Sequence, residues 1–151
     1  MKLIKKNKKA YHDFKIEDEF EAGIVLNGNE VKSLRNHACS IKEAYARINP
    51  HTREVWIHNM TIDRYSHSAD EDYNPNKKRK LLLHKHQIKR LYKKTEERGY
   101  TLIPLALYFN DRNIVKMLLR LGKGKTKYDK RESIKRRDFE REQARLRKNI
   151  L

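Results

Sequence analysis

The side chains in this sequence that could do covalent chemistry are seven histidines and one cysteine. Two histidines together with a lysine could cleave RNA by acid–base catalysis. His84 and His86 stand two residues apart where a helix is expected to begin, so we expect their rings to point in different directions. No His–His or His–Cys spacing is that of a zinc site, and Cys39 has no second cysteine beside it. The sequence therefore predicts no catalytic residue, no metal ligand and no cofactor.

The stronger chemical signal is the capacity to bind phosphate. The chain carries 37 Lys and Arg against 20 Asp and Glu, a formal net charge of +17. The excess lies in three segments, 1–9, 77–98 and 123–151, whereas residues 10–76 carry a net charge of −5. A run of charges is most often a solvated helix face, but lysines spaced i, i+4 without acidic partners repel one another. We therefore expect an external polyanion to neutralise these segments.

Alternation of apolar and polar residues predicts the strands that must carry these charges. It is clearest in a long strand over 14–26, with a bend at Asp18 and a close backbone approach at Gly23. Asn29 is then expected to cap a short helix over 30–38. On that helix Lys32 and Arg35 are three residues apart, free to reach a phosphate. Further strands are predicted over 42–49 and 54–62.

An exposed loop over 64–79 follows, acidic at its start and basic at its end. A helix over 85–98 stops at Gly99, and strands over 100–110 and 114–121 come next, the first with an edge position or bulge at Pro104. Short antiparallel strands with few helices favour a mainly β fold. We expect a small antiparallel OB-like Greek-key barrel of five or six strands with two or three short helices.

Three segments divide the chain. Residues 1–9 are expected to form a flexible basic arm, residues 10–122 the barrel, and residues 123–151 a basic tail. The tail holds twelve Lys or Arg, five Asp or Glu and few large apolar side chains, too little apolar surface to order it alone. We expect it to be disordered in the free protein and to order on a polyanion.

Two further features bear on where the protein acts. No secretory signal and no apolar run of membrane-spanning length occurs, and a single cysteine fits a reducing compartment, so a cytoplasmic protein is expected. A membrane surface is the alternative partner for the tail. Its large apolar residues, among them Ile134, Phe139, Leu146 and Ile150, do not line one helical stripe, which favours RNA.

Four ordered blocks of sequence resemble one known family, the SsrA-binding proteins (small protein B) of bacteria, over nearly the whole chain. The blocks are Glu21-Ala22-Gly23-Ile24 with Gly28 to Arg35, Arg79 to His84, Gly99 to Leu105, and Gly122 to Lys125 with Asp129-Lys130-Arg131. The family pattern is altered at two places: Tyr128 stands where histidine is common, and the Gly-Lys-Lys of the junction is stretched to Gly-Lys-Gly-Lys-Thr-Lys.

The resemblance implies an OB-like barrel that binds the tRNA-like domain of transfer-messenger RNA (SsrA) and enables trans-translation: rescue of stalled ribosomes and tagging of the nascent peptide. The barrel would occupy the place of an absent anticodon stem. The tail would become helical in the empty message channel of the 70S ribosome, near the decoding centre and 16S ribosomal RNA. It also implies a monomeric, non-catalytic protein with no cofactor, no metal and no membrane partner.

Site residues are carried over by position. The resemblance places the RNA-binding residues at Glu30, Lys32, Ser33, Arg35, Lys78, Arg79, Lys80, Lys123 and Lys125. It places the ribosome-binding residues of the tail at Tyr128, Asp129, Lys130, Arg131, Lys135, Arg136 and Arg137. Two other functions remain open on sequence alone: a constitutive ribosomal or ribosomal-RNA-binding protein, and an RNA-processing enzyme that uses the histidines.

Overall fold

The computed structural model of the protein describes residues 1–8, 10 and 14–124. Within those ranges the chain forms nine strands and two helices. In chain order they are β1 (Lys2–Lys6), β2 (Phe14–Ile24), α2 (Gly28–Arg35), β3 (Cys39–Ser40), β4 (Tyr45–Ile48), β5 (Val55–His58), β6 (Thr61–Ile62), β7 (Arg79–Leu82), α3 (Lys85–Arg98), β8 (Tyr100–Phe109) and β9 (Val115–Gly124).

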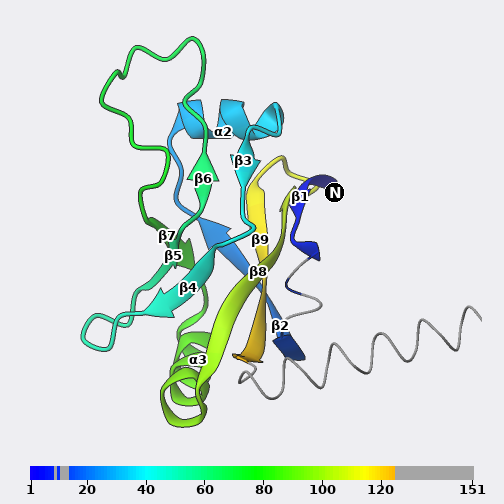
Figure 1. Ribbon diagram of the computed structural model, residues 1–151, viewed down its shortest axis with the longest axis vertical. Coiled ribbons are helices and arrows are strands. Elements are labelled where there is room, and N and C mark those ends of the chain that lie inside the picture. Colours follow the sequence, from blue (N-terminus) through cyan, green and yellow to red (C-terminus); the bar gives the residue numbers. More distant parts are fainter. Residues whose placement is uncertain (9, 11–13, 125–151) are drawn as a thin grey trace, which may run out of the picture.

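Six of the strands close into an antiparallel barrel. Their order is β8-β4-β5-β7-β2-β9, and β9 returns to pair with β8 along its whole length. β1 adds to the far part of β8, beyond the point where β4 pairs with it, and β3 and β6 form a separate small sheet. The predicted mainly β, OB-like barrel is thereby confirmed, and Figure 1 shows α2 and α3 at its opposite ends.

In several strands, period-two alternation places one side in the barrel core, whereas β8 is buried on both faces along most of its length. On β5, for example, Val55 and Ile57 are fully buried while the residues between and after them are half-buried. Leu34 of α2 and Leu91 of α3 are also fully buried and join the same core cluster. Each helix therefore closes one end of the barrel with a leucine.

Irregularities in the strands fall where the sequence predicts them. The pairing of β2 with β9 shifts register between Ile16 and Glu19, around the expected bend at Asp18. A Cβ atom built on Gly23 would lie 3.3 Å from the Cβ of Leu82, so this glycine permits the close approach of β7. Another register shift follows Pro104. Gly99 ends α3 with a φ of +66°, the left-handed conformation expected of a helix stop.

The N-terminal segment differs from the prediction. Residues 1–9 are expected to be a flexible arm, but residues 2–6 form β1, paired antiparallel with β8. The cause is Ile4, only 5% exposed, whose burial in the main core offsets part of the entropy of ordering the strand. The terminal ammonium of Met1 also lies 2.9 Å from Asp111 Oδ1, an exposed and therefore weak ion pair.

Three element boundaries also differ. The cap of α2 is Asn27, not Asn29. The expected strand over 54–62 is broken at Asn59, whose φ of 60° turns the chain between β5 and β6. β9 continues through Gly124 instead of ending at 121, so Lys123, assigned by sequence to the tail, lies in a barrel strand paired with β2. The predictions for the rest of the tail, residues 125–151, lie outside the described residues.

Candidate nucleic-acid interface

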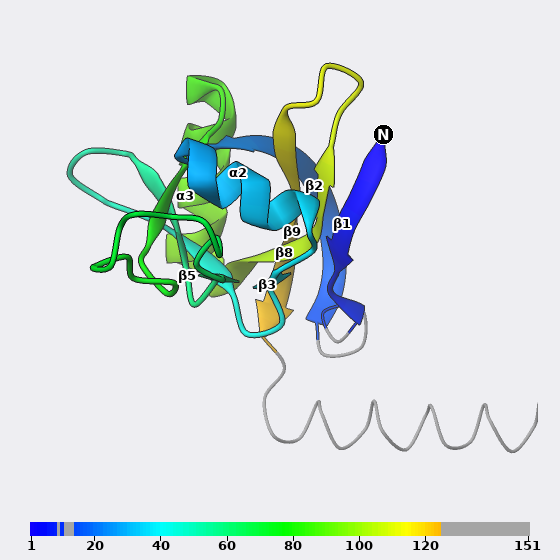
Figure 2. The ribbon, with the colours of Figure 1, turned by 90° about the horizontal axis from the view of Figure 1, so that it is seen from above.

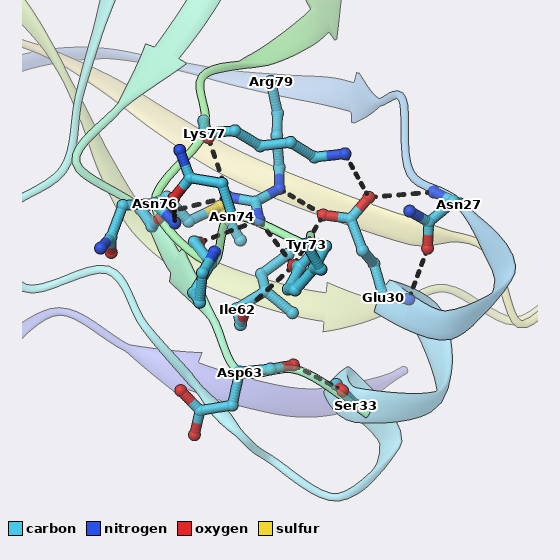
Figure 3. Close-up of polar contacts among 12 residues, drawn as sticks. Asn27, Glu30, Ser33, Ile62, Asp63, Tyr73, Asn74, Asn76, Lys77 and Arg79 are labelled. Atoms are coloured by element: carbon cyan, nitrogen blue, oxygen red, sulfur yellow. Dashed lines mark hydrogen bonds and ion pairs between the residues drawn. The ribbon is translucent and has the colours of Figure 1, made fainter. Parts of the chain in front are cut away.

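A buried ion pair joins α2 to β7. The segment before β7, residues 63–78, is called the long loop. Arg79 Nε donates to Glu30 Oε2 at 2.6 Å, and both residues are only 2% exposed (Figure 3). Glu30 also completes a capping box, because its Oε1 accepts from the N–H of Asn27 at 3.1 Å while Asn27 Oδ1 accepts from the N–H of Glu30 at 2.8 Å. One carboxylate thus starts the helix and fixes the end of the loop.

Arg79 uses all of its donors inside the protein. Besides Glu30, its guanidinium donates to the carbonyl oxygens of Met60, Pro75 and Lys77 and to the Tyr73 hydroxyl, at 2.9–3.1 Å. A guanidinium has five N–H donors, and these five hydrogen bonds occupy them. Arg79 therefore has no donor left for a phosphate and acts as the anchor on which the end of the long loop folds.

Other polar contacts attach the long loop to α2 and to the strand before it. The Tyr73 hydroxyl lies 3.1 Å from Glu30 Oε2 and 2.9 Å from the carbonyl oxygen of Ile62 (Figure 3). At the start of the loop, Ser33 Oγ of α2 donates to the carbonyl oxygen of Asp63 at 2.7 Å. The loop predicted from its composition is thus held at both ends by residues of α2 and β7.

The electrostatics of this cluster keep Glu30 ionised. Burial alone would raise the pKa of its carboxyl group. The N–H of Asn27, the guanidinium of Arg79 and the ammonium of Lys77, 3.6 Å from Oε1, outweigh that effect and lower the pKa below its ordinary value of 4.5. The carboxylate is consequently charged at neutral pH and is matched by buried positive charge.

The lowered pKa predicts how stability depends on pH. A carboxylate whose pKa is depressed in the folded state contributes its stability above the unfolded pKa and loses it as pH falls through the folded pKa. Comparing Glu30→Gln with the unchanged protein in urea unfolding at a series of pH values isolates this contribution. We expect the difference in free energy of unfolding to be constant above about pH 5.5 and to shrink steadily below pH 4.5. A difference that stays constant down to pH 3 would contradict the assignment.

Exposed cations lie on α2 above this anchor. Lys32 and Arg35 are both exposed, and the ammonium of Lys32 lies 5.4 Å from the ring centroid of Tyr65 in the long loop. Arg35 lines a hollow of about 290 Å³ together with Lys2 of β1 and His37. We call Lys32, Arg35, Lys2 and Tyr65 the α2 surface; Figure 2 shows α2, the long loop and β1 side by side at this end of the barrel.

A second exposed set lies on the outer side of the barrel wall. On β7 the side chains alternate, so Arg79 and Leu81 point into the barrel and Lys80 lies on the other face. The ammonium of Lys78 lies 4.7 Å from the ring centroid of Trp56, and Lys80 Nζ lies 3.0 Å from Glu54 Oε2. Trp56 is not among the residues that the sequence predicts. The available signal was its phase, because it alternates with the buried Val55 and Ile57.

The structure thus separates the predicted RNA-binding residues into groups. Glu30, Ser33 and Arg79 are buried and hydrogen-bonded within the protein, and their part in RNA binding stays a prediction. Lys32 and Arg35 come together on the α2 surface, whereas Lys78 and Lys80 lie on the outer wall. An RNA contact by these four stays a prediction. Lys123 lies in β9, and Lys125 and the tail residues Tyr128, Asp129, Lys130, Arg131, Lys135, Arg136 and Arg137 lie outside the described residues.

The groups that could do covalent chemistry can also be placed. The rings of His84 and His86 do not diverge as predicted but stack, with centroids 5.5 Å apart and planes 8° apart. Burial raises the pKa of the Cys39 thiol to about 11, which leaves it protonated at neutral pH. In the part of the chain that the structure describes, no helix has the length and apolar character to span a membrane.

A closed antiparallel barrel with a basic helix at one end and a positively charged outer wall defines an OB-type nucleic-acid-binding protein. Comparison with known proteins narrows this class. The model of the SmpB protein family matches residues 4–149. An SsrA-binding protein of Syntrophobacter fumaroxidans is 53% identical over 147 residues, covering 97% of this chain and 89% of that protein. One of Moorella thermoacetica is 48% identical, covering 96% and 92%. The chain therefore belongs to the SmpB family of SsrA-binding proteins.

A solved structure agrees with this assignment. A chain in the structure described as "tmRNA-SmpB: a journey to the center of the bacterial ribosome" superposes with a TM-score of 0.67 at 41% sequence identity. The match covers 86% of this chain and 93% of that one. Both the barrel and its sequence are therefore those of the family.

Proposed function

We propose that this protein binds the tRNA-like domain of transfer-messenger RNA through the α2 surface and brings that RNA to stalled ribosomes for trans-translation. The observation that carries the proposal is the pairing of exposed Lys32 and Arg35 with a buried anchor that fixes their helix. Cations on a rigid element bind phosphate with less loss of conformational freedom than cations on a free chain. Relatives named SsrA-binding proteins, and a similar chain in a tmRNA–ribosome structure, support this partner.

The proposal is one of recognition, without a chemical step, and it places the protein in the cytoplasm, where ribosomes work. Lys32 and Arg35 would neutralise phosphates and release counterions from the RNA. The basic residues of the tail would make a separate contact with the ribosome. A protein with two such contacts would join transfer-messenger RNA to the ribosome as an adaptor.

The test of the α2 surface is the double variant Lys32→Ala with Arg35→Ala. We expect its affinity for the isolated tRNA-like domain to fall by about 10- to 100-fold, because two contacts with phosphates are lost. The slope of log affinity against log salt should decrease by about 2, one for each lost phosphate contact. Fluorescence anisotropy of the labelled RNA across a salt series measures both quantities.

A matched control removes the same charge from the other end of the barrel. Lys85 and Lys89 are exposed on α3, and changing both to Ala also removes two cations. This control should keep most of the affinity for the tRNA-like domain. Equal losses of affinity in the two double variants would mean that binding depends only on the net charge of the protein, and the α2 surface would not be the site.

A constitutive ribosomal protein and an RNA-processing enzyme remain the competing functions. A ribosomal protein would sediment with every ribosome in stoichiometric amount, whereas an adaptor for rescue would be substoichiometric and enriched on stalled ribosomes. Incubation of the purified protein with end-labelled RNA reveals cleavage if the histidines act catalytically. The RNA that copurifies with the protein from its native cell distinguishes all three.

A further inference from the structure

A face of the barrel wall away from α2 carries aromatic side chains among cations. Tyr45 and Arg47 of β4 and Trp56 and His58 of β5 lie on the side opposite the buried core residues of the same strands. Tyr45 is paired in register with His58, and Arg47 with Trp56. These four residues with Lys78 form a continuous patch, which we call the outer-wall platform.

The geometry of the platform suits flat ligands. The rings of Tyr45 and His58 stack across the strands, with centroids 5.3 Å apart and planes 16° apart. Trp56 stands two residues from His58 on the same face of β5, about 7 Å along the strand. The ring of Trp56 is half-buried and is met by the Lys78 ammonium at 4.7 Å. A base could take the place of that ammonium over the indole, and Lys78 could turn to the adjoining phosphate.

The charge of the platform selects the kind of ligand. Arg47 and Lys78 are exposed, and Lys80 lies next to Trp56 in register across β5 and β7. Lys80 is paired with Glu54, which leaves the local balance positive. Burial, followed by the charges of Lys78 and Arg47, lowers the pKa of His58, so its ring is neutral at neutral pH and adds stacking surface without adding charge.

We propose that the outer-wall platform binds unpaired nucleotides of RNA, with one base stacked on Trp56 and its phosphates held by Lys78 and Arg47. Aromatic side chains bordered by cations are the means by which proteins hold single-stranded RNA, because every base has a π face and a linked phosphate. This site is separate from the α2 surface and rests on the RNA-binding function proposed above. It would give the protein a preference for RNA with exposed bases over a fully paired helix.

Trp56 itself reports on the site, because it is the only tryptophan in the chain. Titration of the full-length protein with single-stranded oligoadenylate is expected to quench its emission in a saturable way. An RNA duplex of the same length, whose bases are already stacked, should bind through its phosphates with much less quenching. Lys78→Ala should alter the emission before RNA is added, whereas Lys2→Ala, an equal loss of charge on β1, should not.

Affinity variants complete the test. Trp56→Ala is expected to weaken binding of labelled oligoadenylate about tenfold, whereas Trp56→Phe, which keeps a ring, should remain within about threefold of the unchanged protein. Thermal unfolding of both variants checks that the barrel is intact, and Trp56→Phe gives the answer if the alanine variant fails to fold. Binding to the tRNA-like domain is measured in parallel with the same proteins.

Each outcome separates this inference from the proposed function. Quenching of the unchanged protein by oligoadenylate, together with a weaker affinity of Trp56→Ala for that RNA, supports the platform. If oligoadenylate does not quench the emission of the unchanged protein, and Trp56→Ala binds it with unchanged affinity while the tRNA-like domain still binds, the platform is overturned and the function stands. If Trp56→Ala keeps its affinity for oligoadenylate but sediments less with ribosomes, the face contacts the ribosome without holding unpaired nucleotides and the inference is wrong. Failure of the unchanged protein to bind either RNA would overturn the proposed function together with the platform.

Discussion

Arg79→Met is expected to lower the free energy of unfolding by about 3–5 kcal/mol, because it leaves the Glu30 carboxylate buried without its partner. The change also removes the donors to three carbonyl oxygens that lie in and beside the long loop. We therefore expect faster hydrogen exchange in the long loop as well as a less stable barrel. Urea unfolding followed by circular dichroism measures the first effect, and hydrogen exchange in residues 63–78 measures the second.

Lys77→Met is the matched control for that variant. Lys77 Nζ lies 3.6 Å from Oε1 of the same carboxylate, but the Lys77 side chain is 43% exposed. Its loss should therefore change the free energy of unfolding by no more than about 1 kcal/mol. The double variant Glu30→Gln with Arg79→Met should be less destabilised than the sum of the two single variants. Additive losses, or a cost for Arg79→Met as small as that for Lys77→Met, would show that the pair is not the anchor.

Deletion of residues 129–151 is expected to reduce tagging on stalled ribosomes by about 100-fold or more while sparing binding to the tRNA-like domain. The deleted segment carries nine Lys or Arg and five Asp or Glu, whereas Lys32 and Arg35 remain on the barrel. Two linked contacts gain about 10²–10⁴ over either one alone, and the truncated protein keeps only one. Tagging in a reconstituted translation system, with anisotropy for RNA affinity, measures the two effects separately.

The control for the truncation supplies the tail as a separate peptide. Residues 129–151 added in trans at equal concentration should not restore tagging, because the effective concentration that the covalent link provides is missing. If the truncated protein loses RNA affinity and tagging to the same degree, the division into a barrel contact and a tail contact is wrong. If the truncation keeps full tagging, the tail has no part in the function.

Local sequence patterns predicted the barrel well because the burial of a strand is visible in the order of apolar and polar residues along it. Alternation located β2 and β9, and single residues located irregularities in the strands: Asp18 at the bend of β2, Pro104 at the shift in β8, and Gly23 at the contact with β7. Gly99 at the end of α3 is the same kind of signal, since it reflects a backbone conformation that few other residues adopt. Each of these features is signalled by the type of a single residue in the element itself.

The role of charged residues was harder to predict because it depends on partners distant in the chain. Arg79 and Glu30 are 49 residues apart, and nothing near either of them in sequence signals that they meet. The run Lys77 to Lys80 therefore appeared as one basic patch, although the strand sends Arg79 inward and leaves Lys80 on the other face. The phase of Arg79 with Leu81 was the available clue, but Leu82 beside it is also apolar and masks the pattern.

The same difficulty concealed β1. Five lysines in the first nine residues indicate an arm, and the single inward side chain of Ile4 is too weak a pattern to predict a strand. What orders this segment is the part of β8 beyond its pairing with β4, a strand distant in the chain. The residues of β1 alone do not show that partner.

β1 ends the strand order of the main sheet, and this position has a consequence for the behaviour of the protein in solution. The outer edge of a sheet is a template on which a second molecule can add its own strand. Three of the five residues of β1 are lysine, so two copies aligned edge to edge would bring like charges together. Salt weakens such repulsion, and concentrated stocks of the protein should therefore resist self-association better at low ionic strength than at high.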